Sequence, residues 1–374
     1  MLSAYALFYG AFGMQSPFVP ALLKDRGLQA EHIGLVLSVA MVVRVLGGPI
    51  IAYTADRRRR HTLMLCGCGI FAALATVSYL TAYSFAGLFC VALLHGVMLG
   101  PIPPISDALG ATAAHRERFH YGWLRGAGSA AFALGTLVSG WQAELPAAML
   151  TSGALLILAG LVSLMLPGLP SAGATVISAG MLRDALNLLQ LPVYRRILIA
   201  ATLVGGSHAL HDSFSVIRWR GAGMELFTVS MLWSEAVLAE VLMFFLLGPW
   251  LIRRIGPGKS MALAALAGVL RWSIAAFTTS PWIFAAIQPL HGMTFALFHL
   301  AAIQLIVATV PIQLAATAQA IYGTLCVGLA IALLTFISGL LFASMGGLAF
   351  LLMAALCLMA LPVCMSLRNA GEAY

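Results

Sequence analysis

Two very long stretches of this chain contain no charged side chain. No Asp, Glu, Lys or Arg occurs from His61 to Ser106, or again from Trp272 to Leu367. Each stretch is longer than one membrane-spanning helix, which needs about 20 apolar residues. A typical soluble domain has about 25% charged residues, whereas this chain of 374 residues has 9%, against 61% hydrophobic residues. The sequence therefore predicts an all-α membrane protein that crosses a bilayer several times.

Apolar segments that end at charged residues, Pro or Gly indicate twelve membrane-spanning helices. Their approximate ranges are 3–23, 32–54, 62–81, 85–110, 119–141, 147–167, 195–216, 227–251, 260–279, 282–308, 316–343 and 347–366. The one long connection that is not apolar lies between the sixth and seventh helices. We therefore predict an N-terminal six-helix bundle over 1–168, a central linker over 169–194 and a C-terminal six-helix bundle over 195–374. The short loops leave no soluble catalytic or nucleic-acid-binding domain.

The distribution of basic residues predicts how the chain lies in its membrane. With the N-terminus in the cytoplasm, the outer loops contain only a few Lys and Arg residues, namely Lys24, Arg26, Arg218 and Arg220. Most of the others then lie in cytoplasmic segments, as the positive-inside rule requires. We therefore expect a multi-pass protein of the inner cell membrane, a monomer, with both termini in the cytoplasm. This topology explains the net charge of +8, so no nucleic-acid partner is expected.

The two halves share a faint internal repeat. Gly48-Pro49 ends the second predicted helix and precedes a basic loop, and Gly248-Pro249 ends the eighth and precedes another. Transporters are commonly built from such duplicated helical units. The repeat therefore favours a carrier over an enzyme or a sensor, although Gly-Pro pairs are common at helix ends.

A few ionisable side chains lie inside the predicted helices, where they are costly. Such groups usually face a cavity or one another, so each is a hypothesis about function. They are Arg44, Asp107, Arg125, Asp212, Glu235, Glu240 and Arg271, with His95, His208, His211, His291 and His299.

Asp107 and Arg125 are predicted to pair across one helical hairpin. Each lies nine residues from Arg116, near the turn between the fourth and fifth helices. In an antiparallel helix pair, equal distances from the turn mean equal depth, here about 13 Å at about 1.5 Å per residue. The guanidinium of such a pair suits a substrate carboxylate or a pair of hydroxyls. The alternative is a permanent ion pair that only holds two helices together.

The same reasoning places Glu240, Arg271 and His291 in one layer of the C-terminal bundle. Glu240 lies 16 residues before Gly256 at one turn, and Arg271 lies 15 residues after it. Across the next turn, near Ser280, Arg271 lies nine residues before and His291 eleven after. Burial favours a neutral carboxylic acid and a nearby Arg favours the carboxylate, so small movements can switch protonation. We predict a proton-binding cluster, with a fixed salt bridge and a hydrogen-bonded histidine as the alternative.

Other ionisable groups carry weaker signals. His291 and His299 are eight residues apart on about one helical face, but no further ligands accompany them at suitable spacing, so no metal and no cofactor are expected. Asp212 and two neighbouring histidines lie near the outer end of the seventh helix and are expected to be interfacial. Asp56 and the basic run after it are expected to stabilise one gating state, or else only to set the topology.

These features together resemble the major facilitator superfamily. Its signature Gly-x-x-x-Asp-Arg-x-Gly-Arg-Arg is similar to the segment that begins at Ala52, in which Ala52 and Arg59 replace the two glycines. The segment reads Ala52-Tyr53-Thr54-Ala55-Asp56-Arg57-Arg58-Arg59-Arg60. The resemblance implies a gating role for Asp56, Arg57 and Arg60.

Within that superfamily, nearly the whole chain most resembles the 3-phenylpropionic acid transporter branch, which is related to lactose permease and the nucleoside proton symporters. The resemblance rests on Arg44, Pro104-Ile105-Ser106-Asp107-Ala108, Tyr121-Gly122, Arg125-Gly126, Gly128-Ser129, Phe214-Ser215, Trp219, Leu232-Trp233-Ser234, Ala239-Glu240-Val241, Arg271-Trp272, Leu290-His291-Gly292-Met293-Thr294-Phe295 and His299-Leu300-Ala301-Ala302. Position by position, it implies that Asp107 and Arg125 bind substrate. It also implies that Glu235, Arg271 and His291 are essential polar groups of the C-terminal half.

Two departures from lactose permease are informative. The proton-carrying glutamate of the permease, three residues after its histidine, is Thr294 here. Its sugar-stacking tryptophan, seven residues after the arginine of helix five, is Phe132 here. The resemblance therefore disfavours galactoside transport, and Glu240, followed by Glu235, becomes the expected proton carrier.

We expect a secondary transporter, not an enzyme, that works by alternating access and takes up an aromatic or hydrophobic carboxylate, such as a 3-phenylpropionate-like acid, with a proton. Its partners are then the substrate, the proton and the lipid bilayer. The expected substrate-binding residues are Arg44, Asp107, Arg125, Phe132, Trp233 and Phe295, and the expected proton-coupling residues are Glu240, Arg271, His291, Glu235 and His299. The alternatives are a proton-coupled exporter, a nucleoside or sugar-type symporter, an intramembrane enzyme and a non-transporting sensor.

Overall fold

The computed structural model describes residues 1–119, 121–168 and 179–367, and their regular secondary structure is helical throughout. The chain divides into two compact units. Unit 1 comprises Met1–Thr175 and Trp219–Ser234, and unit 2 comprises Val176–Arg218 and Glu235–Tyr374. Residues 219–234 belong to unit 1, although the prediction placed them in the C-terminal bundle. The predicted boundaries at 168 and 195 stay a prediction.

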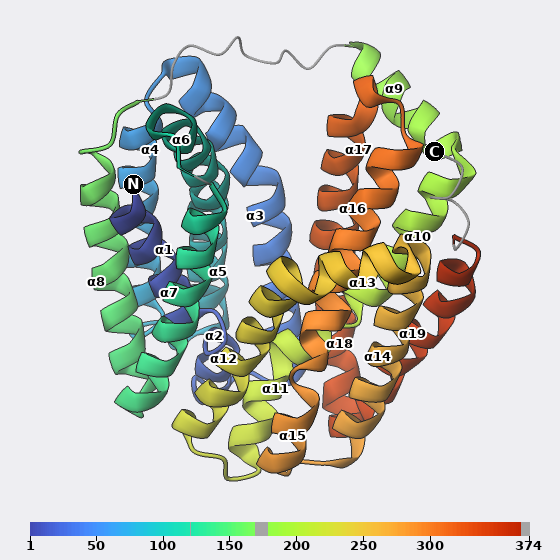
Figure 1. Cartoon of the computed structure of the whole chain (residues 1–374). Helices are drawn as coiled ribbons and strands as arrows, with labels where there is room; N and C mark the ends of the chain where they lie inside the picture. The colour runs from blue at the N-terminus through green and yellow to red at the C-terminus, as the bar shows by residue number, and fades with distance from the viewer. Residues whose placement is uncertain (120, 169–178, 368–374) are drawn as a thin grey trace. The chain divides into compact units, whose positions relative to one another are not determined.

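Unit 1 is built around helix α1, which packs against α7 and α8 (Figure 1). Its helices before residue 169 are α1 (Leu2–Gln15), α2 (Val19–Asp25), α3 (Ala30–Arg58), α4 (His61–Ser78), α5 (Phe85–Leu99), α6 (Ile102–Glu117), α7 (Tyr121–Gln142) and α8 (Leu145–Ser163). α1 and α2 form one interrupted span, as do α5 and α6.

Glycines bring α1 and α7 into backbone contact. A Cβ atom on Gly135 would lie 2.2 Å from the carbonyl oxygen of Gly10, and one on Gly13 would lie 1.9 Å from that of Phe132. Close helix approach through small residues is the usual way in which helices associate within lipid. The hydroxyls of Thr136 and Ser139 add hydrogen bonds of 2.9 Å to α1 carbonyl oxygens.

In unit 2, α14 packs against α16 and α19, and α10 also packs against α19. The elements that follow α8 along the chain are α9 (Ala179–Gln190), α10 (Pro192–Gly206), α11 (Ala209–Gly221), α12 (Leu226–Leu242), η1 (Met243–Leu247), α13 (Gly248–Ile255), α14 (Pro257–Phe277), α15 (Pro281–Ile287), η2 (Gly292–Leu297), α16 (Phe298–Thr309), η3 (Ile312–Leu314), α17 (Ala315–Ile321), η4 (Tyr322–Leu329), α18 (Ala330–Met345), η5 (Gly346–Ala349) and α19 (Phe350–Met365). The segments η1, η2 and η4 are π-helical.

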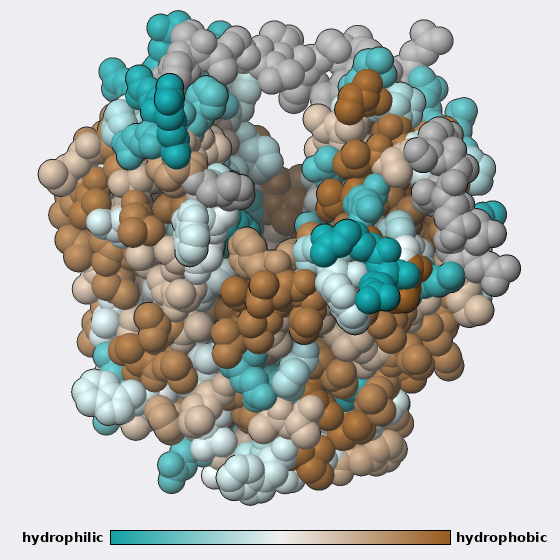
Figure 2. Space-filling view, in the orientation of Figure 1, coloured by the Kyte–Doolittle hydropathy of each residue, from teal (hydrophilic) through white to brown (hydrophobic). Residues whose placement is uncertain are grey.

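The helices account for the twelve predicted spans. Among the described residues, nine helical stretches are long and apolar enough to cross a membrane. The last of these, Ile312–Met365, reverses at Gly346, which has a φ of 55°, and so contains two spans. The more polar α7 and the α10–α11 pair supply the remaining two. The surface agrees with this assignment, because large apolar side chains such as Leu158 and Leu161 of α8 are exposed, and Figure 2 shows broad hydrophobic areas on both units.

Two details differ from expectation. Pro49 does not mark the end of the second span but lies inside α3, which continues to Arg58. Gly48 at this point lets α3 approach the backbone of Gly100, to which a Cβ atom would come within 3.0 Å. The predicted linker contains α9, while its residues 169–178 lie outside the described part of the chain.

Candidate functional site

Unit 1 contains a polar cluster formed by two tyrosines of α1, Asp107 of α6 and Arg125 of α7. The Tyr5 hydroxyl donates a 2.6 Å hydrogen bond to Asp107 Oδ1. Arg125 Nη1 donates to Asp107 Oδ2 at 3.2 Å and to the hydroxyls of Tyr5 and Tyr9 at 3.3 Å each. Asp107 and Arg125 are therefore paired as the hairpin spacing predicts, and both side chains remain partly exposed, at 34% and 49%.

The local sequence explains how the tyrosines reach this pair. Tyr5 and Tyr9 are four residues apart on one helix, so their rings stack with centroids 4.5 Å apart. Gly128 of α7 leaves room for them, because a Cβ atom there would lie 2.6 Å from the Tyr5 ring. Sequence reasoning missed both hydroxyls, although the i, i+4 spacing of the tyrosines was a signal.

Three other residues of unit 1 were predicted to bind substrate, namely Arg44, Phe132 and Trp233. Arg44 of α3 is exposed and forms no hydrogen bond or salt bridge with the described residues, but it interacts electrostatically with Tyr9. Tyr9 also meets Phe12 edge to face at 5.6 Å. Phe132 of α7 and Trp233 of α12 are both half-buried. Their part in substrate binding stays a prediction.

Unit 2 contains a hydrogen-bonded chain through the three residues that were predicted to share one layer. His291 Nε2 lies 2.6 Å from Glu240 Oε1, and its Nδ1 lies 2.8 Å from Arg271 Nη1. Arg271 is only 1% exposed and also donates from Nη2 to Gln288 Oε1 at 2.8 Å. The predicted juxtaposition is confirmed, and Gln288 is an additional partner that the sequence analysis overlooked.

The chain continues on the far side of Arg271. Arg271 Nη2 lies 3.4 Å from His211 Nε2, and His211 Nδ1 lies 3.0 Å from Asp212 Oδ1. The expectation of a merely interfacial site was wrong for the two histidines, because His208 and His211 are each 2% exposed and His211 contacts the central arginine, whereas the Asp212 side chain is 50% exposed. Their position along the helix predicts an interfacial location. Their surroundings are decided instead by the face that α11 presents to Arg271.

A further histidine borders this chain. His208 Nε2 lies 3.0 Å from the Thr294 hydroxyl, and its Nδ1 lies 3.1 Å from the carbonyl oxygen of Val204. Its ring meets the His291 ring edge to face at 5.2 Å. Thr294, which takes the place of an expected acid, thus belongs to the lining of the cluster.

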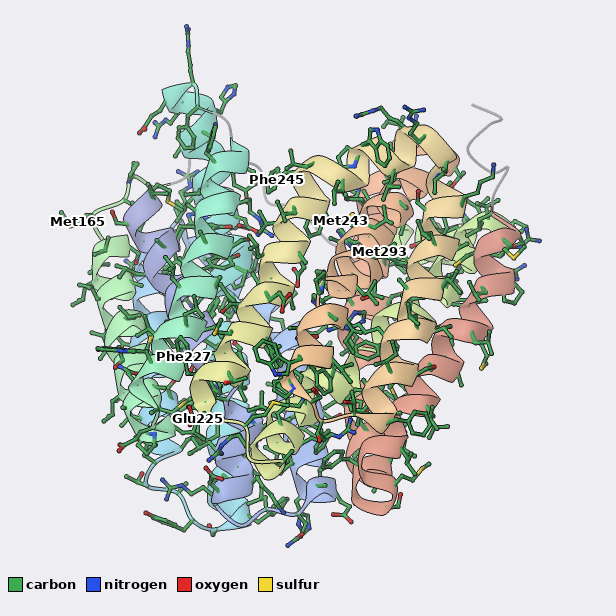
Figure 3. All side chains as sticks on the ribbon, turned by 60° about the horizontal axis from the view of Figure 1, so that its bottom comes forward. Met165, Glu225, Phe227, Met243, Phe245 and Met293 are labelled. Carbon is green, nitrogen blue, oxygen red and sulfur yellow. The ribbon has the colours of Figure 1, made fainter. Side chains whose placement is uncertain are left out.

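His291 comes directly before one π-helical segment, and Glu240 lies three residues before another. These segments, η1 and η2, pack against each other, and Figure 3 labels Met243 and Met293 on them. Phe295 of η2 lies parallel to the His291 ring, with centroids 5.7 Å apart and an interplanar angle of 4°. π-Helical segments often occur at functional sites.

The two remaining predicted proton-coupling residues lie outside this chain. Glu235 is half-buried, and no hydrogen bond or ion pair joins it to the described residues. His299 contacts Tyr322 instead, with its Nδ1 3.1 Å from the hydroxyl oxygen. Their participation in proton coupling stays a prediction.

The predicted gating segment forms the end of α3 and the beginning of α4. Asp56 Oδ1 lies 2.6 Å from Nε2 of the buried His61, while Arg57 and Arg60 are exposed. Arg59 stands where the superfamily signature has its second glycine and has a φ of 54°. That left-handed conformation explains why the signature has glycine at this position, because glycine adopts it at little cost and other residues at more.

The described residues contain no group of three or more His, Cys, Asp or Glu side chains that could hold a metal ion. The polar groups instead form two separate arrangements. Unit 1 offers hydroxyls, a carboxylate and guanidinium groups, and unit 2 offers a hydrogen-bonded chain of ionisable groups with a buried centre. Such ionisable groups inside membrane helices are typical of substrate and proton pathways.

Comparisons with known proteins agree with this reading of the fold. Residues 1–360 match the profile of the MFS_1 like family. A probable 3-phenylpropionic acid transporter of Escherichia coli (strain K12) is 32% identical over 364 residues, which cover 96% of this chain and 94% of that protein. A maltose permease of Geobacillus stearothermophilus is 26% identical, with 90% and 86% covered. The crystal structure of the nucleoside transporter NupG has a TM-score of 0.86 at 15% identity, with 98% and 97% covered.

The fold and the intramembrane polar groups define a multi-pass secondary transporter. The chain belongs to the MFS_1 like family of major facilitator superfamily transporters. It is therefore a carrier with a twelve-helix fold rather than an enzyme.

Proposed function

We propose that this protein takes up a small aromatic or hydrophobic carboxylate, of the 3-phenylpropionate type, together with a proton. One observation carries the proposal, namely the buried chain from Glu240 through His291 to Arg271. The name of the Escherichia coli relative supports the substrate class. In alternating access, the substrate site is exposed first to one side of the membrane and then to the other.

The chain has the chemistry that a proton carrier needs. A guanidinium is always a hydrogen-bond donor, so Nδ1 of His291 must accept from Arg271. The remaining ring proton therefore lies on Nε2, which donates to Glu240 as a carboxylate. A proton that neutralises Glu240 weakens this charge-assisted hydrogen bond and thereby changes how two helices are held. With 23% of its side chain exposed, Glu240 can exchange protons with water.

Arg44 is the best candidate to bind the carboxylate of the substrate. The Arg125 guanidinium already has Asp107 and two tyrosine hydroxyls as partners. Arg44 has no such partner among the described residues and remains exposed within a membrane helix. A carboxylate bound there would satisfy an otherwise costly charge. The half-buried ring of Tyr9, which packs against the buried Phe12, would offer the aromatic part of the substrate an apolar surface.

We further propose an inner-membrane location with both termini in the cytoplasm, because the basic residues follow the positive-inside rule. The Asp56–His61 pair would then lie at the cytoplasmic side. There it would help to hold one gating state, beside the exposed Arg57 and Arg60. Substrate, proton and bilayer would be the partners of a monomeric carrier.

The test is transport by the purified protein in proteoliposomes. We expect an inward proton gradient to drive accumulation of labelled 3-phenylpropionate, and Glu240→Gln to reduce that accumulation by at least about tenfold, equivalent to about 1.4 kcal/mol. Glu225→Gln is the matched control, because Glu225 is an exposed carboxylate near the opposite end of the same helix (Figure 3). Unchanged accumulation by Glu240→Gln would contradict the proposed proton carrier.

A nucleoside or sugar-type symporter is the second candidate. Tyr5, Tyr9, Asp107 and Arg125 together offer the donors and acceptors that bind hydroxyl groups. Thermal unfolding of the purified protein with each compound tests this candidate. Stabilisation by nucleosides or maltose, but not by aromatic acids, would favour it. Outward transport driven by the proton gradient would instead identify an exporter.

A further inference from the structure

The side chains around Arg271 form a chain with a carboxylate at each end. The order is Glu240, His291, Arg271, His211 and Asp212, with adjacent groups 2.6, 2.8, 3.4 and 3.0 Å apart. The centre is buried, whereas the Asp212 and Glu240 side chains are 50% and 23% exposed. Both ends can therefore reach water, and the middle cannot.

The hydrogen-bond donors and acceptors fix the protonation of the two histidines. Arg271 only donates, so Nδ1 of His291 and Nε2 of His211 both accept from it, and the Gln288 side chain also bonds with His211. Each ring then carries its proton on the other nitrogen and donates to a carboxylate, Glu240 on one side and Asp212 on the other. Both imidazoles are neutral in this arrangement. They are oriented oppositely, so the chain is nearly symmetric about Arg271.

The charges of this chain leave a place for one proton. Two carboxylates and one guanidinium sum to a single negative charge, and the uptake of one proton makes the chain neutral. Burial favours the neutral state. The other titratable groups close by do not supply this charge. His208 bonds with Thr294 and with backbone carbonyl oxygens, and the Cys357 thiol donates to Ser207.

We propose that the His211–Asp212 pair is a second proton-binding site, which shares Arg271 with the Glu240–His291 pair. A proton added to the accepting nitrogen of either histidine replaces its lone pair with an N–H, so that histidine must release Arg271. A positive charge also disfavours a proton on the pair that it contacts. The proton therefore resides on the pair that Arg271 has left.

The structure shows which pair Arg271 prefers in this state. Its contact with His291 is 2.8 Å and its contact with His211 is 3.4 Å. The His211–Asp212 pair has the longer contact and the more exposed carboxylate, so it is the pair that takes up the proton first and then releases Arg271. When Arg271 moves toward His211, Glu240 and His291 become the acceptor. The proton therefore enters and leaves by different carboxylates. This role of the His211–Asp212 pair rests on the proposed proton coupling and extends it.

The experiment compares Asp212→Asn with wild type in two proteoliposome assays. We expect accumulation driven by a proton gradient to fall at least about tenfold. Exchange of substrate across the membrane at equal pH, which needs no net proton movement, should stay within about twofold of wild type. Asp212→Glu should restore accumulation, because it restores the carboxylate. Arg253→Gln, an exposed helix-end change, serves as the control.

Three results would overturn the second site. Wild-type accumulation by Asp212→Asn would show that the carboxylate takes no proton, and equal loss of accumulation and exchange would assign it a purely structural role. A second readout does not depend on the substrate: the purified Asp212→Asn protein should take up fewer protons than wild type in a pH titration with an indicator dye. If wild-type vesicles themselves show no proton-driven accumulation, the proposed function fails, whereas an unchanged dye titration fails the second site alone.

Discussion

Single residues decide the chemistry of this carrier because so few charges lie within its helices. Arg125 and Arg271 are both surrounded by acceptors, whereas Arg44 is not. An arginine whose donors are already used can position a neighbour, but an arginine with unused donors can bind a ligand. The identity of the partners therefore separates the roles that we propose for three residues that look alike in the sequence.

We predict that Arg44→Gln weakens binding of 3-phenylpropionate by roughly tenfold to a hundredfold, because a hydrogen bond to a charged group contributes about 1.5–3 kcal/mol. Binding of the uncharged amide of the same acid should change little. Isothermal titration of the purified protein with both ligands measures this difference. Equal weakening for the acid and the amide would mean that Arg44 does not contact the carboxylate.

Among the elements, the close approach of η2 to α12 sets the distance between Glu240 and His291. Gly292 at the beginning of η2 lies against α12, where a Cβ atom would come within 2.5 Å of the Ala239 carbonyl oxygen. Glu240 follows directly, and His291 directly precedes the glycine. The close approach of these two backbones thus permits the 2.6 Å contact between the two side chains.

We predict that Gly292→Ala lengthens this contact and lowers proton-driven accumulation several-fold, while the folded protein is retained. Gly323→Ala is the matched control, since a Cβ atom there meets nothing within 4 Å. Alanine is also favoured over glycine in helices by up to about 1 kcal/mol, so loss of activity only in Gly292→Ala isolates the steric effect. Transport assays and thermal unfolding of both variants test the prediction, and identical behaviour of the two would refute it.

At the scale of the whole molecule, much could be predicted from the sequence. The uncharged stretches indicated the spans, and distances from turns placed Asp107 beside Arg125 and Glu240 near Arg271 and His291, because helices in a hairpin have a fixed rise per residue. The rest depended on helix rotation. The side of α11 that bears His211, and the tyrosines that α1 directs at Asp107, follow from packing that no turn distance specifies.

The topology is testable at the same scale. With both termini in the cytoplasm, green fluorescent protein fused after residue 367 should fluoresce, and alkaline phosphatase fused there should be inactive. Phosphatase inserted after Gly223, in the exposed turn between α11 and α12, should be active. The reverse pattern would show that the basic residues do not orient the chain as the positive-inside rule predicts.

The contact of α1 with α7 limits how this carrier can evolve. Any side chain at Gly13 or Gly135 would force the two backbones apart, and with them the tyrosines from Arg125. A lineage that acquires a new substrate must leave these positions unchanged. If Phe132 and Arg44 bind substrate as we propose, variation would instead accumulate there, because neither side chain holds α1 against α7.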